Sequence, residues 1–214
     1  HTVPVPANFY GDSKLQADVA VRELAEDGFK VIVLRPPLIY GRGSKGNYPI
    51  LARFAKKLPV FPNVNNERSM LYIDNLCELL CQVMLIKDLK QNATVLLPQN
   101  TEWTNTADMV KKIAKVSGKK IAVLRGMRLV AFIGGKMPGK IGELVNKAFG
   151  NSCYAHELSI YPGINYQKVS LSESIIRTEG NAEGEINFKR HILVVSQYFY
   201  PEQFRVNDIC QEWV

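Results

Sequence analysis

The sequence predicts an α/β fold, and two neighbouring patterns carry this prediction. Residues 13–27 have the period of an amphipathic helix, and residues 31–34 form a continuous apolar run rich in β-branched residues. Such a run is typical of a strand that is covered on both faces, as in parallel sheets. A helix followed by a buried strand is half of a β-α-β unit. With 46% hydrophobic and 22% charged residues, the 214-residue chain has an ordinary globular composition.

The first helix and strand have clear boundary signals. The helix pattern rests on apolar residues at i, i+3, i+4 and i+7, namely Ala17, Ala20, Val21 and Leu24. Gly28 is expected to stop the helix as the residue after its C-cap. Pro36 and Pro37 are expected to end the strand, because proline has no N–H to donate to a neighbouring strand.

The same patterns predict further elements as far as residue 149. In chain order they are a helix at 49–58, a strand at 70–73, a helix at 75–86, a strand at 94–97, a helix at 104–116, a strand at 120–124, and helices at 127–133 and 139–149. Asp74 is expected to cap the helix at 75–86. Thr104 is expected to cap the helix at 104–116, and Gly118 to stop it.

The amino-acid composition of the chain changes after residue 180. Residues 181–189 are polar and turn-rich, as expected of a linker. A new buried strand at 191–196 and a helix beginning at 204 are expected beyond it. The predicted organisation is therefore a domain at 1–180, a linker at 181–189 and a strand-helix fragment at 190–214, which cannot bury a core of its own.

Charge and cysteine content limit the classes of function. The net charge is +7, but lysine and arginine are scattered without an arginine-rich stripe, so we expect no nucleic-acid binding. A diphosphate-bearing substrate suits this charge equally well. The apolar stretch at 124–135 is interrupted by Arg125 and Arg128, and we expect no membrane span.

The four cysteines show no Cys-x-x-Cys spacing, and a zinc site is not expected. Cys77 and Cys81 are four residues apart on a predicted helix and are expected to be buried core thiols. Cysteines without such spacing, expected to be free thiols, predict a reducing, cytoplasmic location.

The segment Tyr10-Gly-Asp-Ser-Lys14 carries the clearest chemical pattern. On a helix, residues four apart lie on one face, so the phenol and the ammonium are neighbours. A free tyrosine titrates near pH ~10, and a fixed positive charge beside a phenol lowers its pKa. The pair is a candidate acid/base device; the alternative is a half-buried tyrosine beside a solvated lysine.

Several further motifs follow in a fixed order. They are Leu34-Arg-Pro-Pro37, Tyr40-Gly41 and Arg68-Ser-Met-Leu-Tyr-Ile-Asp-Asn-Leu76. Together with Tyr-x-x-x-Lys, this succession over about residues 1–180 resembles the extended short-chain dehydrogenase/reductase family. More narrowly, it resembles the NAD-dependent epimerases and dehydratases of nucleotide-linked sugars in bacterial surface-polysaccharide pathways.

The resemblance implies a doubly wound, Rossmann-like fold and specific roles for six residues. Tyr10 would be the catalytic acid/base, and Lys14 would bind the nicotinamide ribose, so both would touch the cofactor, which is NAD (NADP is not excluded). Pro36 and Pro37 would lie beside the nicotinamide. In the substrate site, Asn47 would contact the sugar nucleotide, and Arg68 would hold the diphosphate, to which a guanidinium fork is well suited.

The segment Gly41-Arg-Gly-Ser-Lys-Gly46 matches the dinucleotide-binding pattern Gly-x-Gly-x-x-Gly, but we reject that interpretation. Residues 36–40 separate it from the strand, and no acidic residue follows about 20 positions later to bind a ribose. We interpret it instead as a flexible loop near the substrate, whose backbone can approach a sugar or phosphate closely.

The chain also departs from the family pattern. It shows neither the family's glycine-rich opening nor the serine or threonine that precedes the tyrosine. The expectation is therefore the C-terminal, substrate-side half of such an enzyme with a small α/β substrate region, binding NAD weakly or not at all by itself. Residues 190–214 resemble the beginning of a family-4-type glycosyltransferase.

The predicted function is NAD-dependent epimerisation of a UDP-sugar. Three alternatives stay open: a reductase or dehydratase of the same family, an inactive fragment or non-enzymatic interaction domain, and a glycosyltransferase. The resemblance also implies a homodimer.

Overall fold

The computed structural model describes residues 5–6, 8–86, 89, 91–124 and 149–180. The helix expected at 127–133, most of the helix expected at 139–149, the linker at 181–189 and the glycosyltransferase-like segment at 190–214 lie outside the described residues.

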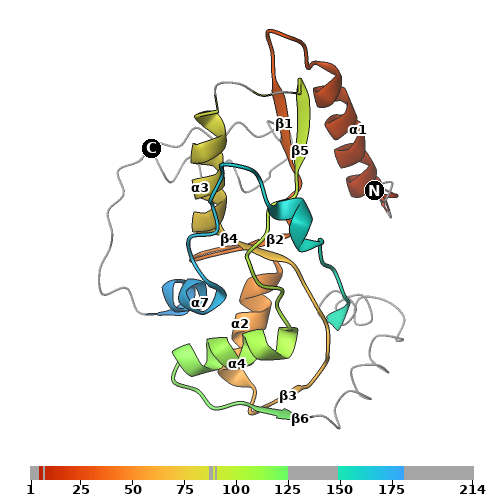
Figure 1. The fold of residues 1–214 in the computed structure, drawn as a ribbon. Coiled ribbons are helices and arrows are strands. Elements are labelled where there is room, and N and C mark those ends of the chain that lie inside the picture. Colours follow the sequence, from red (N-terminus) through yellow and green to blue (C-terminus); the bar gives the residue numbers. More distant parts are fainter. Residues whose placement is uncertain (1–4, 7, 87–88, 90, 125–148, 181–214) are drawn as a thin grey trace. The chain divides into compact units, whose positions relative to one another are not determined.

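The described strands form three parallel pairs, which confirms the predicted α/β class (Figure 1). Their members are β1 (Val31–Leu34) with β5 (Ala93–Leu96), β2 (Leu38–Tyr40) with β4 (Met70–Tyr72), and β3 (Val60–Pro62) with β6 (Ala122–Leu124). Each pair joins strands that are distant in sequence, as parallel pairing requires a crossover connection.

Five α-helices and one short 3₁₀ helix are described alongside these strands. They are α1 (Phe9–Glu23), α2 (Asn47–Lys57), α3 (Ile73–Met84), α4 (Thr106–Val116), the 3₁₀ helix η2 (His156–Ser159) and α7 (Leu171–Glu179). Helix α4 contacts both α2 and α7, and these three helices lie close together in Figure 1.

The largest group of buried apolar residues lies among α2, α4, α7 and the β2–β4 pair. Tyr40, Met109, Val110, Ile113 and Ile175 are fully buried there. In α4, the buried residues at 106, 107, 109, 110, 113 and 114 follow the helical period and form one apolar face. This core holds α2 against the beginning of α4.

Helix α1 begins and ends four residues earlier than expected. Asn8 caps it, its side chain accepting a hydrogen bond from the Gly11 N–H at 2.9 Å. The helix ends at Glu23, and Gly28 lies instead in a turn closed by two backbone hydrogen bonds between Glu26 and Phe29. The expectation that Gly28 stops the helix was therefore wrong.

Two predicted helix caps were also wrong. Helix α3 starts at Ile73, so Asp74 lies in its first turn and is not its cap. Helix α4 is capped by Asn105 rather than Thr104: the Asn105 side chain accepts hydrogen bonds from the N–H groups of residues 107 and 108. Gly118, with a φ of 67°, follows the C-cap of α4 and stops it as predicted.

Burial around β1 is lighter than the sequence predicted. Only Val31 is buried in this strand, and no residue of α1 is buried. Cys77 and Cys81 are half-buried rather than core thiols, although burial still raises the pKa of the Cys77 thiol.

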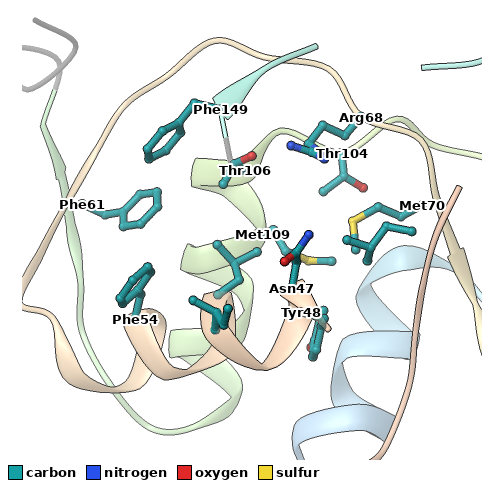
Figure 2. Close-up of a pocket in the computed structure, with 13 residues that line it drawn as sticks. Asn47, Tyr48, Phe54, Phe61, Arg68, Met70, Thr104, Thr106, Met109 and Phe149 are labelled. Atoms are coloured by element: carbon teal, nitrogen blue, oxygen red, sulfur yellow. The ribbon is translucent and has the colours of Figure 1, made fainter. Parts of the chain in front are cut away.

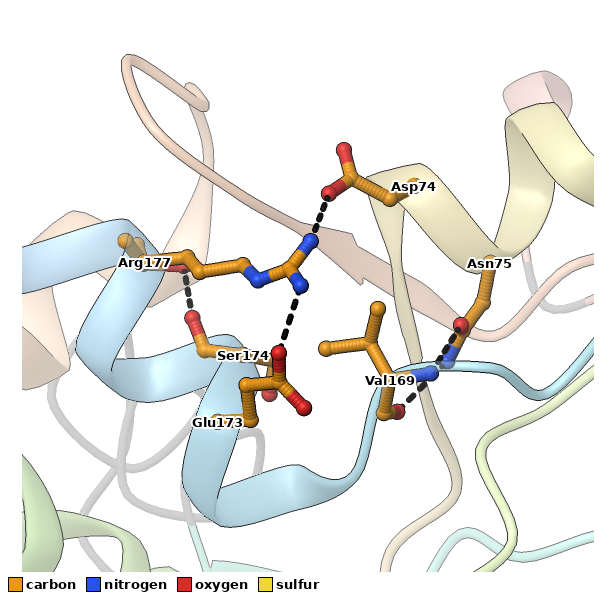
Figure 3. Close-up of polar contacts among 7 residues, drawn as sticks. Asp74, Asn75, Val169, Glu173, Ser174 and Arg177 are labelled. Atoms are coloured by element: carbon orange, nitrogen blue, oxygen red, sulfur yellow. Dashed lines mark hydrogen bonds and ion pairs between the residues drawn. The ribbon is translucent and has the colours of Figure 1, made fainter. Parts of the chain in front are cut away.

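Helix α7 is fixed to the beginning of α3 by polar contacts (Figure 3). The amide of Asn75, fully buried, accepts a hydrogen bond from the Val169 N–H and donates one to the Val169 carbonyl, both at 3.0 Å. Nearby, the Arg177 guanidinium lies between the carboxylates of Asp74, at 3.2 Å, and Glu173, at 2.5 Å. Asp74 is thus an ion-pair partner of α7.

Replacing Gly41 with alanine is expected to lower the free energy of unfolding by about 1–3 kcal/mol. A Cβ at Gly41 would lie 2.4 Å from Ile73 Cγ2, and a β-branched side chain cannot easily turn away. Urea denaturation measures the change. Gly28→Ala is the matched control, because its Cβ would meet no atom within 4 Å and its φ is not positive. Equal stability of the two variants would contradict this packing argument.

Candidate functional site

A cavity of about 200 Å³ lies between the beginning of α2, β3 and the beginning of α4 (Figure 2). One part of its wall is aromatic, formed by Phe54, Phe61 and Phe149. The polar side chains that line it include Asn47 and Arg68, so two of the residues predicted to bind substrate meet at one cavity.

Local backbone structure places these two polar residues. Asn47 is the first residue of α2, and its predecessor Gly46 has a φ of 100°, which favours glycine. Arg68 precedes β4 and is held by two backbone hydrogen bonds with Thr104, of 3.0 and 2.9 Å. The Ser69 N–H, next in the chain, donates to the Ser152 carbonyl at 2.9 Å.

The cavity presents a positive charge in largely apolar surroundings. Arg68 is half-buried, and this burial lowers the pKa of its guanidinium from the ordinary value. An arginine nevertheless stays protonated at neutral pH. None of the described lining residues carries a carboxylate. A ligand with an aromatic part and a negative charge would complement both the phenylalanines and Arg68.

Tyr10 and Lys14 lie on one face of α1, with the Lys14 ammonium 5.4 Å from the centroid of the Tyr10 ring. The Tyr10 side chain is accessible, with 56% of its surface exposed. Ser13, inside the same motif, donates a hydrogen bond from its hydroxyl to the Tyr10 backbone carbonyl at 2.9 Å. Neither Tyr10 nor Lys14 is among the described residues that line the cavity.

Pro36 and Pro37 connect β1 to β2 and are half-buried. Helix α1 runs beside β1 in the opposite direction, so the beginning of α1, with Tyr10, lies toward the end of β1 that the prolines follow (Figure 1). Asp18 of α1 secures this arrangement by pairing with Arg35 at 2.5 Å. Ligands of open α/β sheets bind outside the carboxyl ends of the strands, which is where these residues lie.

Sequence reasoning missed the aromatic wall and Thr104 as a lining residue. Ile50 and Phe54 are four residues apart on α2, a spacing that could have indicated a shared face. Phe61 and Phe149 are 88 positions apart in the sequence, yet their ring centroids are 5.7 Å apart. No local pattern could have brought these two together.

The described residues contain neither a metal-binding cluster nor a helix that could span a membrane. No cluster of three or more histidine, cysteine, aspartate or glutamate side chains that could hold a metal ion is present among them. Within the same part of the chain, no helix has both the length and the apolar character needed to cross a membrane.

Residues 1–96 match the model of the NAD dependent epimerase/dehydratase family. A UDP-glucose 4-epimerase of Vibrio cholerae is 34% identical over 113 residues, which cover 51% of this chain and 34% of that protein. The chain thus matches about a third of the length of this curated relative.

Solved structures show the same fold. The UDP-glucose 4-epimerase of Thermus thermophilus, in complex with NAD, superposes with a TM-score of 0.52 at 16% identity, covering 82% of this chain and 54% of that one. The UDP-glucose 4-epimerase of Thermotoga maritima, with UDP-glucose, superposes with a TM-score of 0.53 at 19% identity, covering 83% of this chain and 56% of that one. The chain therefore spans about half of each.

The matched segment contains Tyr10, Lys14 and the prolines that follow β1, as well as Asn47 at the cavity. Residues 1–96 are therefore similar to the NAD dependent epimerase/dehydratase family.

Proposed function

We propose that the full-length protein is an NAD-dependent epimerase that acts on a UDP-sugar. The observation that carries this proposal is the pairing of the Tyr10 phenol and the Lys14 ammonium on one accessible face of α1. The similarity to UDP-glucose 4-epimerases supports the reaction, and the cavity with Asn47 and Arg68 supports the substrate class.

The residues present fit the nicotinamide end of a dinucleotide. A phenol hydroxyl and an ammonium, both hydrogen-bond donors, share one face of α1, and Pro36 and Pro37 lie beyond the carboxyl end of β1. Tyr10, Lys14 and the two prolines would therefore hold this group. When bound, the dinucleotide would supply the hydride acceptor that the oxidation of an alcohol requires.

The role of Tyr10 is the movement of a proton. Oxidation of a sugar hydroxyl releases a proton from its oxygen, and the Tyr10 phenolate would accept it; the reverse transfer would restore the hydroxyl. The Lys14 ammonium lies over the Tyr10 ring, 5.4 Å from its centroid, on the same face of α1. Asp18 would keep α1 in place through its ion pair with Arg35, which follows β1.

The cavity would hold the nucleotide part of the substrate. The guanidinium of Arg68 can donate two parallel hydrogen bonds to diphosphate oxygens, and the phenylalanines offer flat apolar surface to a base. Asn47 can donate from its amide to a phosphate or a sugar hydroxyl.

The direct test uses the full-length protein with UDP-glucose, UDP-galactose and NAD. Proton NMR of the reaction mixture should show conversion of one UDP-sugar into its epimer, with no net consumption of NAD. Net formation of reduced cofactor, or loss of water from the sugar, would instead indicate the reductase or dehydratase alternative. Absence of any conversion of several UDP-sugars would contradict the proposal.

Changing Arg68 to methionine is expected to weaken UDP binding by about 10–100-fold, because a charge-assisted hydrogen bond is worth roughly 1.5–3 kcal/mol. Arg68→Lys should recover only part of the affinity, since an ammonium lacks the planar fork. Isothermal titration calorimetry with UDP measures both. Arg53→Met, on α2 but not among the described lining residues, is the control. Equal losses in both arginine variants would show a general charge effect and remove Arg68 from the site.

Three further statements stay predictions: the formation of a homodimer and a part in surface-polysaccharide synthesis, both from the resemblance, and a cytoplasmic location, from the cysteine content. Size-exclusion chromatography with light scattering tests the first of these on the full-length protein.

A further inference from the structure

Thr104 combines burial with an unused hydroxyl. Its side chain is part of the cavity wall, and the residue is only 3% exposed. Within the part of the chain that the structure describes, its Oγ1 has no hydrogen-bond partner. Buried hydroxyl groups nearly always have one, so this atom calls for an explanation.

A nearby threonine shows the usual arrangement. Thr106 also lines the cavity, but its hydroxyl accepts a hydrogen bond from the Asn66 amide at 2.8 Å. The Asn66 side chain also accepts from the Thr106 N–H at 3.0 Å. Thr106 is therefore tied into the fold, and Thr104 is the threonine at this cavity whose hydroxyl remains available among the described residues.

The backbone directs Thr104 to the same place as Arg68. The two residues form an antiparallel bridge in which each N–H donates to the other's carbonyl, at 3.0 and 2.9 Å. Residues directly opposite each other in an antiparallel pair project to the same face. Both side chains accordingly line the cavity, where Figure 2 shows them as neighbours.

We propose that the Thr104 hydroxyl donates a hydrogen bond to a phosphate oxygen of the nucleotide diphosphate that Arg68 holds. This inference rests on the proposed function and adds a residue that determines specificity for the phosphorylated part of the ligand. A hydroxyl beside a guanidinium gives an anion two donors from adjacent directions, and a hydrogen bond to a charged oxygen is stronger than one between neutral groups. Thr104 also lacks a competing partner, among the described residues, that the ligand would have to displace.

A bound water offers the main alternative explanation. If a water molecule alone satisfied Oγ1, removal of the hydroxyl would leave ligand affinity unchanged. If the hydroxyl instead faced the base of the nucleotide, its removal would weaken the binding of uridine and of UDP alike. The two alternatives therefore differ from the proposal in a measurable way.

The test measures the binding of UDP and of uridine to the full-length protein by calorimetry. Valine has nearly the shape of threonine without its hydroxyl, so Thr104→Val should raise the Kd for UDP about 10–100-fold and leave the Kd for uridine unchanged. Thr104→Ser, which keeps the hydroxyl, should stay within about twofold of the wild type for both.

Ser117→Ala is the matched control. Its hydroxyl is also buried and without a partner among the described residues, but it is at the end of α4 and does not line the cavity, so this change should leave both Kd values unaltered. A melting curve of each variant shows that the fold is retained.

The outcomes separate the two proposals. Unchanged UDP affinity in Thr104→Val, or equal weakening of UDP and uridine, would overturn the role of Thr104 while leaving the proposed function intact. A wild-type protein that binds neither UDP nor uridine would overturn the proposed function, and this inference with it.

Discussion

Replacing Tyr10 with phenylalanine in the full-length protein is expected to lower the turnover number about 10³-fold while leaving the affinity for the UDP-sugar unchanged. General acid/base catalysis by a positioned side chain contributes about 10²–10⁴-fold to a rate, and phenylalanine keeps the ring but removes the group that carries the proton. The structure supports this separation of effects, because Tyr10 is not among the described residues that line the cavity with Asn47 and Arg68.

The fold should tolerate this change. Tyr10 is 56% exposed, and its helix begins at the Asn8 cap, which the substitution leaves in place. A loss of activity would therefore report on chemistry rather than on unfolding. Circular dichroism and a melting temperature equal to that of the wild type would establish this point.

The measurement is a steady-state determination of kcat and KM by NMR or a coupled assay, with calorimetric UDP binding alongside. Ser13→Ala provides the matched control, because Ser13 lies within the same motif but donates its hydroxyl to the helix backbone. It should retain at least about half of the wild-type turnover. Full activity in the Tyr10→Phe variant would exclude Tyr10 as the acid/base group.

The sequence predicted those parts of the fold whose signals are local. The strand at 31–34 was placed correctly because its apolar run and the following proline pair act within a few residues. Gly118 was identified as a helix stop for the same reason. The cap of α4 was misplaced by one position, at Thr104 instead of Asn105, because both residue types favour the same conformation before a helix.

Local sequence patterns could not predict contacts between segments that are distant in the chain. Strands β2 and β3 were not predicted: β2 directly follows Pro36 and Pro37, β3 includes Pro62, and proline is disfavoured within strands. Helix α7 is far from α4 in the sequence and contacts it only in the folded protein. The cavity depends on such contacts: Arg68 was singled out by its motif, but only the structure shows that Thr104 is paired with it.

Asn75 provides the second large expected effect, on stability. Its amide is a polar link between α3 and the chain just before α7, because it both accepts from the Val169 N–H and donates to the Val169 carbonyl, each at 3.0 Å (Figure 3). It also donates to Asn100 Oδ1 at 3.2 Å. All three residues are buried, so water cannot easily replace the amide.

Asn75→Ala is expected to lower the free energy of unfolding by about 3 kcal/mol, since each buried polar group left without its partner costs about 1–3 kcal/mol. Urea denaturation, with an unchanged m-value, measures this loss.

Asn151→Ala is the control: Asn151 is exposed and accepts a hydrogen bond from the Glu67 N–H, so its removal should cost less than about 0.5 kcal/mol. Asn75→Asp should be at least as destabilising as alanine, because a carboxylate can accept from Val169 but cannot donate to its carbonyl and would bury a charge. Equal stability of the Asn75 and Asn151 alanine variants would show that this link does not hold α7 to α3.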